Sequence, residues 1–204
     1  HYKEDEEEVD NLLTRSKELS EDDWIRVGLF DLCALEKAAY HKQFEEGFIS
    51  TYIVRRLIAQ VEDMLDGLQK GTAGYQKSST KILGFNWRFR LMLTLHRRFG
   101  YSKGLSRHLA DRFEILLSSQ TVMKETLLTS LPKMESLIGQ KAGETLKALI
   151  ENRLEKTEQA LQMLQLQYPE YFQILQKRYL SHVAIRLQEA DYEQLHEDTV
   201  ISGE

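Results

Sequence analysis

The chain has 204 residues, of which 42% are hydrophobic and 29% are charged, and its formal net charge is −5. That length can form one large domain or two small ones, with enough apolar residues to bury a core. The single cysteine excludes an intramolecular disulfide framework and a paired-cysteine metal site. No run approaches the roughly 20 apolar residues that a membrane span needs.

The first third of the chain predicts an acidic helical region. Residues 1–10 are too acidic to bury and are expected to be solvated. Ser20, followed three residues later by an aspartate, has the spacing of a capping box, and the apolar positions after it predict a helix that ends at Gly47. Ser50 is the predicted N-cap of the next helix. Cys33 lies on the apolar stretch of the first helix, which favours a buried structural thiol over a nucleophile.

A glycine-containing stretch follows the second helix. The run from Gly71 to Thr80 has the composition of a linker, because it is rich in glycine, serine and threonine. It divides an N-terminal acidic helical part, residues 1–74, from a basic helix and a long helical hairpin, residues 75–204. The alternative is that both parts form one continuous domain.

Charge differs sharply between the two parts. Residues 1–46 carry a net charge of −8, whereas residues 75–112 carry +8. Residues 81–99 predict an aromatic helix with four arginines, which either lies against anionic lipid headgroups or packs in the core with its arginines paired to the acidic region. Nucleic acid is disfavoured, because the chain is acidic overall and has no helix-turn-helix or RNP motif. The candidate membrane-facing or partner-facing residues are Trp87, Arg88, Arg90, Arg97, Arg98, Lys103 and Arg107.

The region from Ser102 to Leu195 predicts three long amphipathic helical legs. Pro132 interrupts the first leg, Gly139 and Gly143 mark a weak point or short break in the second, and Pro169 opens the third. Legs of this length cannot bury their apolar stripes alone, so we expect them to fold back as antiparallel neighbours. The predicted fold is all-α, a bundle of about six helices with a long antiparallel helical hairpin. The legs carry more apolar surface than three helices can bury, which predicts a homodimer.

No motif in the sequence points to catalysis. Glu193 and His196 have the E-x-x-H spacing of di-iron bundles, but the second pair that such a site needs is missing. The six histidines lack zinc-ligand spacing, and the glycines match no phosphate-binding loop. We therefore expect no enzymatic activity, no metal and no cofactor.

Two stretches carry a family resemblance. Leu35 to Leu65 contains the corner Y-H-K-Q-F-E-E-G-F-I-S followed by T-Y-I-V-R-R-L-I-A-Q-V-E-D-M-L. Tyr168 to Ser202 contains Y-P-E-Y-F-Q-I-L-Q-K-R-Y-L and then A-I-R-L-Q-E-A-D-Y-E-Q-L-H-E-D-T-V-I-S. Both resemble the cytoplasmic tail that follows the transmembrane part of sodium/proton (monovalent cation/proton) antiporters.

This resemblance implies a regulatory or assembly domain at the cytoplasmic face of the cell membrane. The implied partners are the transmembrane part of the same polypeptide, a second copy of the chain, anionic lipid headgroups and a cyclic-nucleotide-binding domain after Glu204. The carboxylates that bind the transported ion in that family lie in transmembrane helices, so no transport residue is carried over to this chain.

The start at His1 and the predicted N-cap at Ser202 lead us to expect a segment of a larger protein. The alternative function is a stand-alone helical adaptor or signalling module that binds a partner protein. Upstream hydrophobic spans in the same gene would favour the antiporter over the adaptor.

Overall fold

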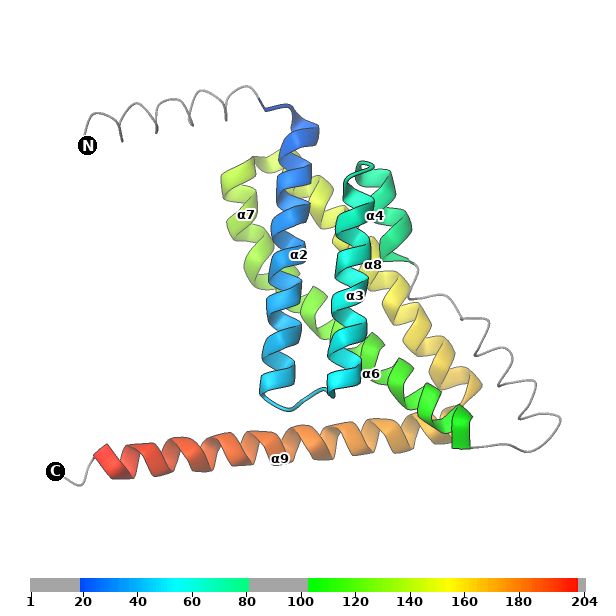
Figure 1. Ribbon diagram of the computed structural model, residues 1–204, viewed down its shortest axis with the longest axis vertical. Helices are drawn as coiled ribbons and strands as arrows, with labels where there is room; N and C mark the ends of the chain where they lie inside the picture. The colour runs from blue at the N-terminus through cyan, green and yellow to red at the C-terminus, as the bar shows by residue number, and fades with distance from the viewer. Residues whose placement is uncertain (1–18, 81–102, 202–204) are drawn as a thin grey trace.

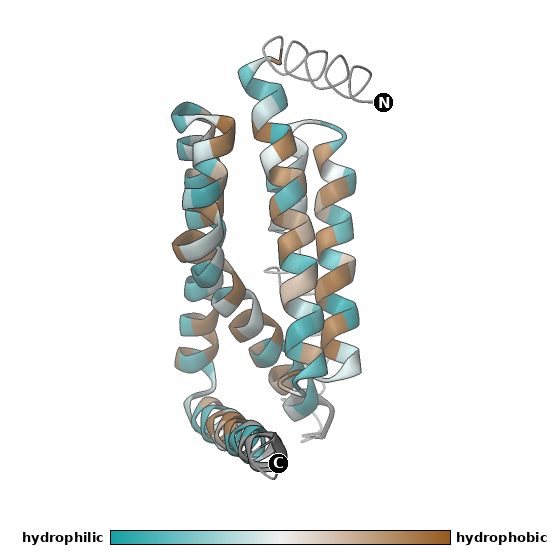
Figure 2. Ribbon diagram, turned by 90° about the vertical axis from the view of Figure 1, so that its left-hand side faces the viewer, coloured by the Kyte–Doolittle hydropathy of each residue, from teal (hydrophilic) through white to brown (hydrophobic). Residues whose placement is uncertain are grey.

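The computed structural model describes residues 19–80 and 103–201, and every regular element in these two ranges is a helix (Figure 1). The all-α prediction is confirmed over this part of the chain. Helices α2 (Glu21–Glu45), α3 (Thr51–Leu68) and α4 (Thr72–Ser79) form one layer. The second layer contains α6 (Lys103–Glu125), η2 (Thr126–Ser130), α7 (Leu131–Ile138) and α8 (Gln140–Gln167), and Figure 2 shows the two layers facing each other.

Local sequence signals define the corner between α2 and α3. The Ser20 hydroxyl accepts a hydrogen bond from the Asp23 N–H, and the Asp23 carboxylate accepts one from the Ser20 N–H, which completes the predicted capping box. Gly47 follows the end of α2 with φ of 74°, a backbone conformation that favours glycine. The Ser50 hydroxyl then accepts a hydrogen bond from the Ile53 N–H at the start of α3. These predicted helix boundaries are confirmed.

The predicted linker is wrong, because most of it forms a helix that packs tightly against α3. Gly71 turns the chain with φ of 89°, and α4 begins at the next residue. A Cβ atom at Gly67 would lie only 2.5 Å from the Gly74 carbonyl oxygen, so the two helices approach each other through a pair of glycines. Tyr75 is buried in the resulting contact.

The second layer is the predicted antiparallel hairpin, but its reversal is not at the proline. Pro132 lies in the first turn of α7, and the π-helical turn η2 before it accommodates the ring, so α7 continues α6 as one rod. The chain reverses at Gly139, whose φ is 93°, and α8 then runs back along this rod (Figure 1). Of the two glycines predicted to mark a weak point, Gly139 forms the break, whereas Gly143 is buried within α8.

The layers share one apolar core, which contains residues from both sides of the predicted boundary at 74/75. Leu29 of α2, Leu57 and Val61 of α3, Tyr75 of α4 and Leu146 of α8 all belong to it. With α7 counted as the continuation of α6, the described helices form six rods, in agreement with the expected number.

Helix α9 (Pro169–Ile201) departs from the predicted arrangement. It starts at Pro169, as expected, but it crosses the end of the two layers instead of folding back along the hairpin (Figure 1). The turn at Tyr168, with φ of −138° and ψ of 59°, redirects the chain. Across the described residues, no helix combines the length and the apolar character that a membrane span requires.

Candidate interaction surfaces

A buried ion pair joins the two layers. Arg153 of α8 donates two hydrogen bonds to the Glu36 carboxylate of α2, one of them with an Nη1–Oε2 distance of 2.6 Å. Only 4% of Arg153 and 6% of Glu36 is exposed. The Tyr40 hydroxyl donates to the same carboxylate at 2.5 Å and lies 3.2 Å from the Ser119 hydroxyl of α6. The pair therefore connects α2, α6 and α8 at one buried point.

Burial determines the ionisation of the groups around this pair. Burial alone disfavours a charge on Arg153, but the adjacent Glu36 carboxylate outweighs it and holds the pKa of the guanidinium well above its usual value. Burial raises the pKa of Tyr75, which hydrogen-bonds to Arg153, to about 12. It also raises the pKa of the Cys33 thiol to about 12. The buried structural thiol predicted at Cys33 is confirmed. All these groups lie away from solvent, so the network connects the two layers inside the core and is not exposed on a surface.

A small aromatic cluster fixes the first turns of α9 to the bundle. Phe113 of α6 packs edge-on against Phe172 and Tyr179 of α9, with ring centroids 5.3 Å and 6.4 Å away. Burial raises the pKa of the Tyr179 hydroxyl, and the nearby Glu114 carboxylate raises it further. These rings extend a second core cluster built on Leu109 and other apolar residues of α6 and α8.

Farther along, α9 passes the corner between α2 and α3. A Cβ atom at Gly47 would lie 2.8 Å from the Arg186 guanidinium carbon, so the absence of a side chain at this corner makes room for α9. Arg186 donates to Glu189 at 2.8 Å on the same helix. A hollow of about 410 Å³, lined by Gln43 and Val183 among others, remains between α9, α2 and α6.

Three exposed apolar residues lie in a line on the side of α9 that faces away from the bundle. Ile174, Ile185 and Tyr192 are separated by eleven and seven residues, which places them on one face of a helix. Their exposed fractions are 64%, 53% and 73%. We call these three residues the outer face of α9. Exposed apolar side chains that share one face of a helix can contact another helix, and here polar residues such as Arg178 and Gln188 separate them.

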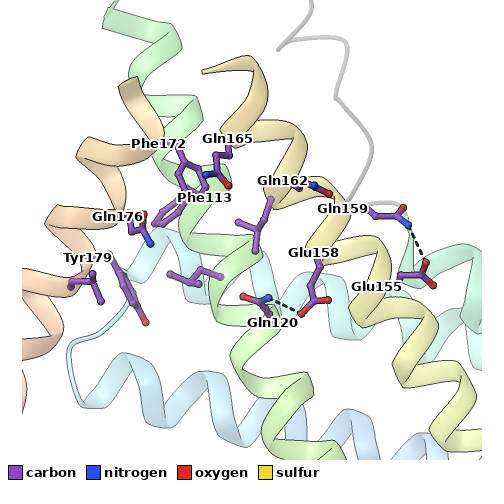
Figure 3. A pocket seen from close by; sticks show the side chains of 13 residues that line it. Phe113, Gln120, Glu155, Glu158, Gln159, Gln162, Gln165, Phe172, Gln176 and Tyr179 are labelled. Carbon is purple, nitrogen blue, oxygen red and sulfur yellow. Dashed lines mark hydrogen bonds between the residues drawn. The ribbon is translucent and has the colours of Figure 1, made fainter. Parts of the chain in front are cut away.

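A groove lies on the other side of α9, between α6, α8 and α9. Its volume is about 650 Å³, and it is drawn in Figure 3. The groove has an apolar floor, which also contains the aromatic cluster that anchors α9. The floor residues are Phe113, Leu117, Leu161, Phe172, Tyr179 and Leu180.

The rim of this groove is rich in amides and carries two carboxylates. Glu158 accepts hydrogen bonds from Gln120 at 3.0 Å and from Lys124 at 2.8 Å, and the Lys124 and Gln120 contacts lower the pKa of this carboxyl. Glu155 accepts from Gln159 at 3.1 Å (Figure 3). Besides Gln120 and Gln159, the glutamines are Gln162, Gln165 and Gln176. No lysine, arginine or histidine belongs to the described lining of the groove.

Comparison with models of protein families, with curated proteins and with solved structures found no match to this chain. The surfaces are therefore interpreted from their own geometry and chemistry.

Most of the predicted membrane-facing residues lie outside the described part of the chain. This applies to Trp87, Arg88, Arg90, Arg97 and Arg98.

The other two predicted residues begin α6. Lys103 is the first residue of this helix, and Arg107 is exposed one turn later. Burial raises the pKa of Asp111, and the positive charge of Arg107 partly offsets this rise. The described helices thus bring Arg107 close to one acidic residue of its own helix.

In the competing prediction, the basic stretch pairs with the acidic N-terminal third. In the structure, two of those acids pair with other residues. Glu21 pairs with Lys141, and Glu36 pairs with Arg153. Both basic residues belong to α8 and lie outside the stretch from 75 to 112.

Sequence reasoning missed the Glu36–Arg153 pair, although the sequence holds a signal for it. Each residue lies at a helical spacing within a largely apolar stripe: Glu36 between Cys33 and Tyr40, and Arg153 between Ile150 and Leu161. A charge in such a stripe is expected either to be paired or to end the stripe. Two such charges of opposite sign in one chain suggest a buried pair.

Proposed function

We propose that this chain is a regulatory and assembly domain of a sodium/proton antiporter and that it acts by pairing two copies through the outer face of α9. The observation that carries the proposal is the exposure of Ile174, Ile185 and Tyr192 in one row on a helix that the bundle holds from the opposite side. The assignment to an antiporter is supported by the two sequence stretches that resemble the cytoplasmic tails of that family.

The size of α9 suits a modest interface. From Ile174 to Tyr192 the outer face spans about 28 Å of helix, and a face about 10 Å wide offers on the order of 300 Å² per copy. Two copies would bury about 600 Å², which is below the range of a stable interface and typical of a weak, transient one. A weak dimer is the expected result, which suits a contact that changes during regulation.

The pairing is tested by sedimentation equilibrium. The wild-type chain is expected to be a dimer at about 100 μM, and the triple variant Ile174→Gln, Ile185→Gln, Tyr192→Gln is expected to be a monomer with unchanged helicity. The matched control is Leu128→Gln with Leu137→Gln, because both leucines are 79% exposed but lie in η2 and α7, away from α9. A monomeric wild-type chain, or equal dissociation of the control, would contradict the pairing.

The antiporter assignment needs a separate test. The gene that encodes this chain is expected to encode about a dozen apolar spans of about 20 residues before it. Sodium-dependent proton flux, measured in vesicles that contain the full-length protein, is expected to change when the outer face of α9 is substituted. A stand-alone adaptor predicts the α9 dimer without such spans and without the flux.

A further inference from the structure

We infer that the groove between α6, α8 and α9 is a docking site for a basic amphipathic helix of a partner protein. The inference is independent of the α9 dimer, since the groove and the outer face lie on different sides of α9. Three properties of the groove support it: its apolar floor, its acidic and amide rim, and its open shape between helices.

The floor provides the apolar contact that such a helix needs. Leu180 is 58% exposed although it lines the groove, so it lacks apolar cover from the described chain. Phe172 and Tyr179, only partly buried, form the adjoining wall from α9. A partner helix that places two or three apolar side chains here would cover these residues, as in other helix-in-groove complexes.

The rim determines the charge of the partner. Glu155 and Glu158 lie on the α8 side of the groove, and no cationic side chain of the described residues lines it. The Lys124 ammonium compensates Glu158 in part, but no cation in the described lining compensates Glu155, which accepts a hydrogen bond from the neutral Gln159 amide. A lysine or arginine beside the apolar stripe of the partner would be attracted here, whereas an acidic residue would be repelled.

The amides are suited to the polar flank of a helix. Gln162 and Gln165 of α8 and Gln176 of α9 line this part of the groove (Figure 3). Each amide offers both donors and an acceptor, so this part of the rim can hydrogen-bond to polar side chains of either type. The groove therefore favours a positively charged side chain beside the carboxylates and accepts hydrogen-bond donors or acceptors beside the amides.

The test is fluorescence anisotropy with two labelled peptides of about 16 residues, long enough to form an amphipathic helix. The basic probe has leucines along one face and lysines beside them, and the acidic probe has glutamate in place of each lysine. The full chain is expected to bind the basic probe at least tenfold more tightly. Raising the salt from about 50 to about 300 mM is expected to reduce this preference, because the charges are exposed.

Charge variants locate the binding. Gln162→Lys with Gln176→Lys adds two positive charges at the rim and is expected to weaken binding of the basic probe at least tenfold. The matched control, Gln140→Lys with Gln173→Lys, makes the same change on the same two helices outside the groove and is expected to have little effect. Equal affinity for both probes, or no binding of either probe, would overturn the inference. So would an equal effect of the control, or dissociation of a dimer by the rim variant.

Discussion

Removing one member of the buried ion pair is expected to destabilise the protein strongly. Arg153→Met leaves the Glu36 carboxylate without its cation in a place where only 6% of the residue is exposed. At an effective dielectric constant of about 20, two charges about 4 Å apart attract by about 4 kcal/mol. Loss of one partner from a buried pair costs about 3–5 kcal/mol, which is a large part of a typical total stability of about 5–15 kcal/mol.

The assay is urea denaturation of the whole chain, followed by circular dichroism at 222 nm. The urea midpoint is expected to fall for Arg153→Met and for Glu36→Gln, whereas the slope stays constant. The double variant is expected to lose about 2 kcal/mol less than the sum of the single losses, because neither charge is then left alone.

A surface ion pair that also involves α2 provides the control. Lys37 and Glu62 join α2 to α3 at 3.2 Å, but their side chains are 33% and 58% exposed. Lys37→Met is expected to cost no more than about 1 kcal/mol, since water screens exposed pairs. A loss below about 1 kcal/mol for Arg153→Met, or simple additivity in the double variant, would refute the reasoning.

Three other predictions test separate parts of the structure. Burial raises the pKa of Cys33 from 9.0 and of Tyr75 from 10.0 to about 12, so the unfolded chain loses these protons first. Stability is therefore expected to fall above about pH 9, by up to about 1.4 kcal/mol per pH unit for each group, and an unchanged urea midpoint at pH 10.5 would contradict this. Gly74→Ala is expected to cost about 1–3 kcal/mol in urea, because the new methyl group meets the Gly67 backbone, whereas Lys77→Ala on the exposed side of α4 changes stability little. If the basic stretch faces a membrane, the chain is expected to sediment with anionic vesicles at low salt and to lose this binding when Arg88, Arg90, Arg97 and Arg98 are changed to Gln; failure of the wild-type chain to bind would exclude that role.

Local features were predictable wherever a helix boundary depends on neighbouring residues. The capping box at Ser20, the N-cap at Ser50, the stop at Gly47 and the start at Pro169 all appear at the expected positions. Each involves a hydrogen bond or a backbone conformation within a few residues, so its energy is already determined in a short segment. The helical periodicity is local in the same sense, and the all-α class followed from it.

The linker prediction failed because local composition does not show what each glycine packs against. Glycine, serine and threonine between Gly71 and Thr80 are typical of a loop, but here the glycines allow α3 and α4 to touch. Whether a glycine makes a chain flexible or permits close packing depends on what lies opposite it. At Gly74 the opposite group is the Gly67 backbone, which comes from another helix.

The tertiary structure alone determined which charges meet and where the surfaces lie. Glu36 and Arg153 are 117 residues apart, and they become neighbours only because the reversal at Gly139 brings α8 back across α2. The groove and the outer face of α9 likewise exist because the turn at Tyr168 sends that helix across the bundle end. Apolar spacing predicts which face of a helix is buried, but the crossing of helices distant in sequence depends on packing in three dimensions.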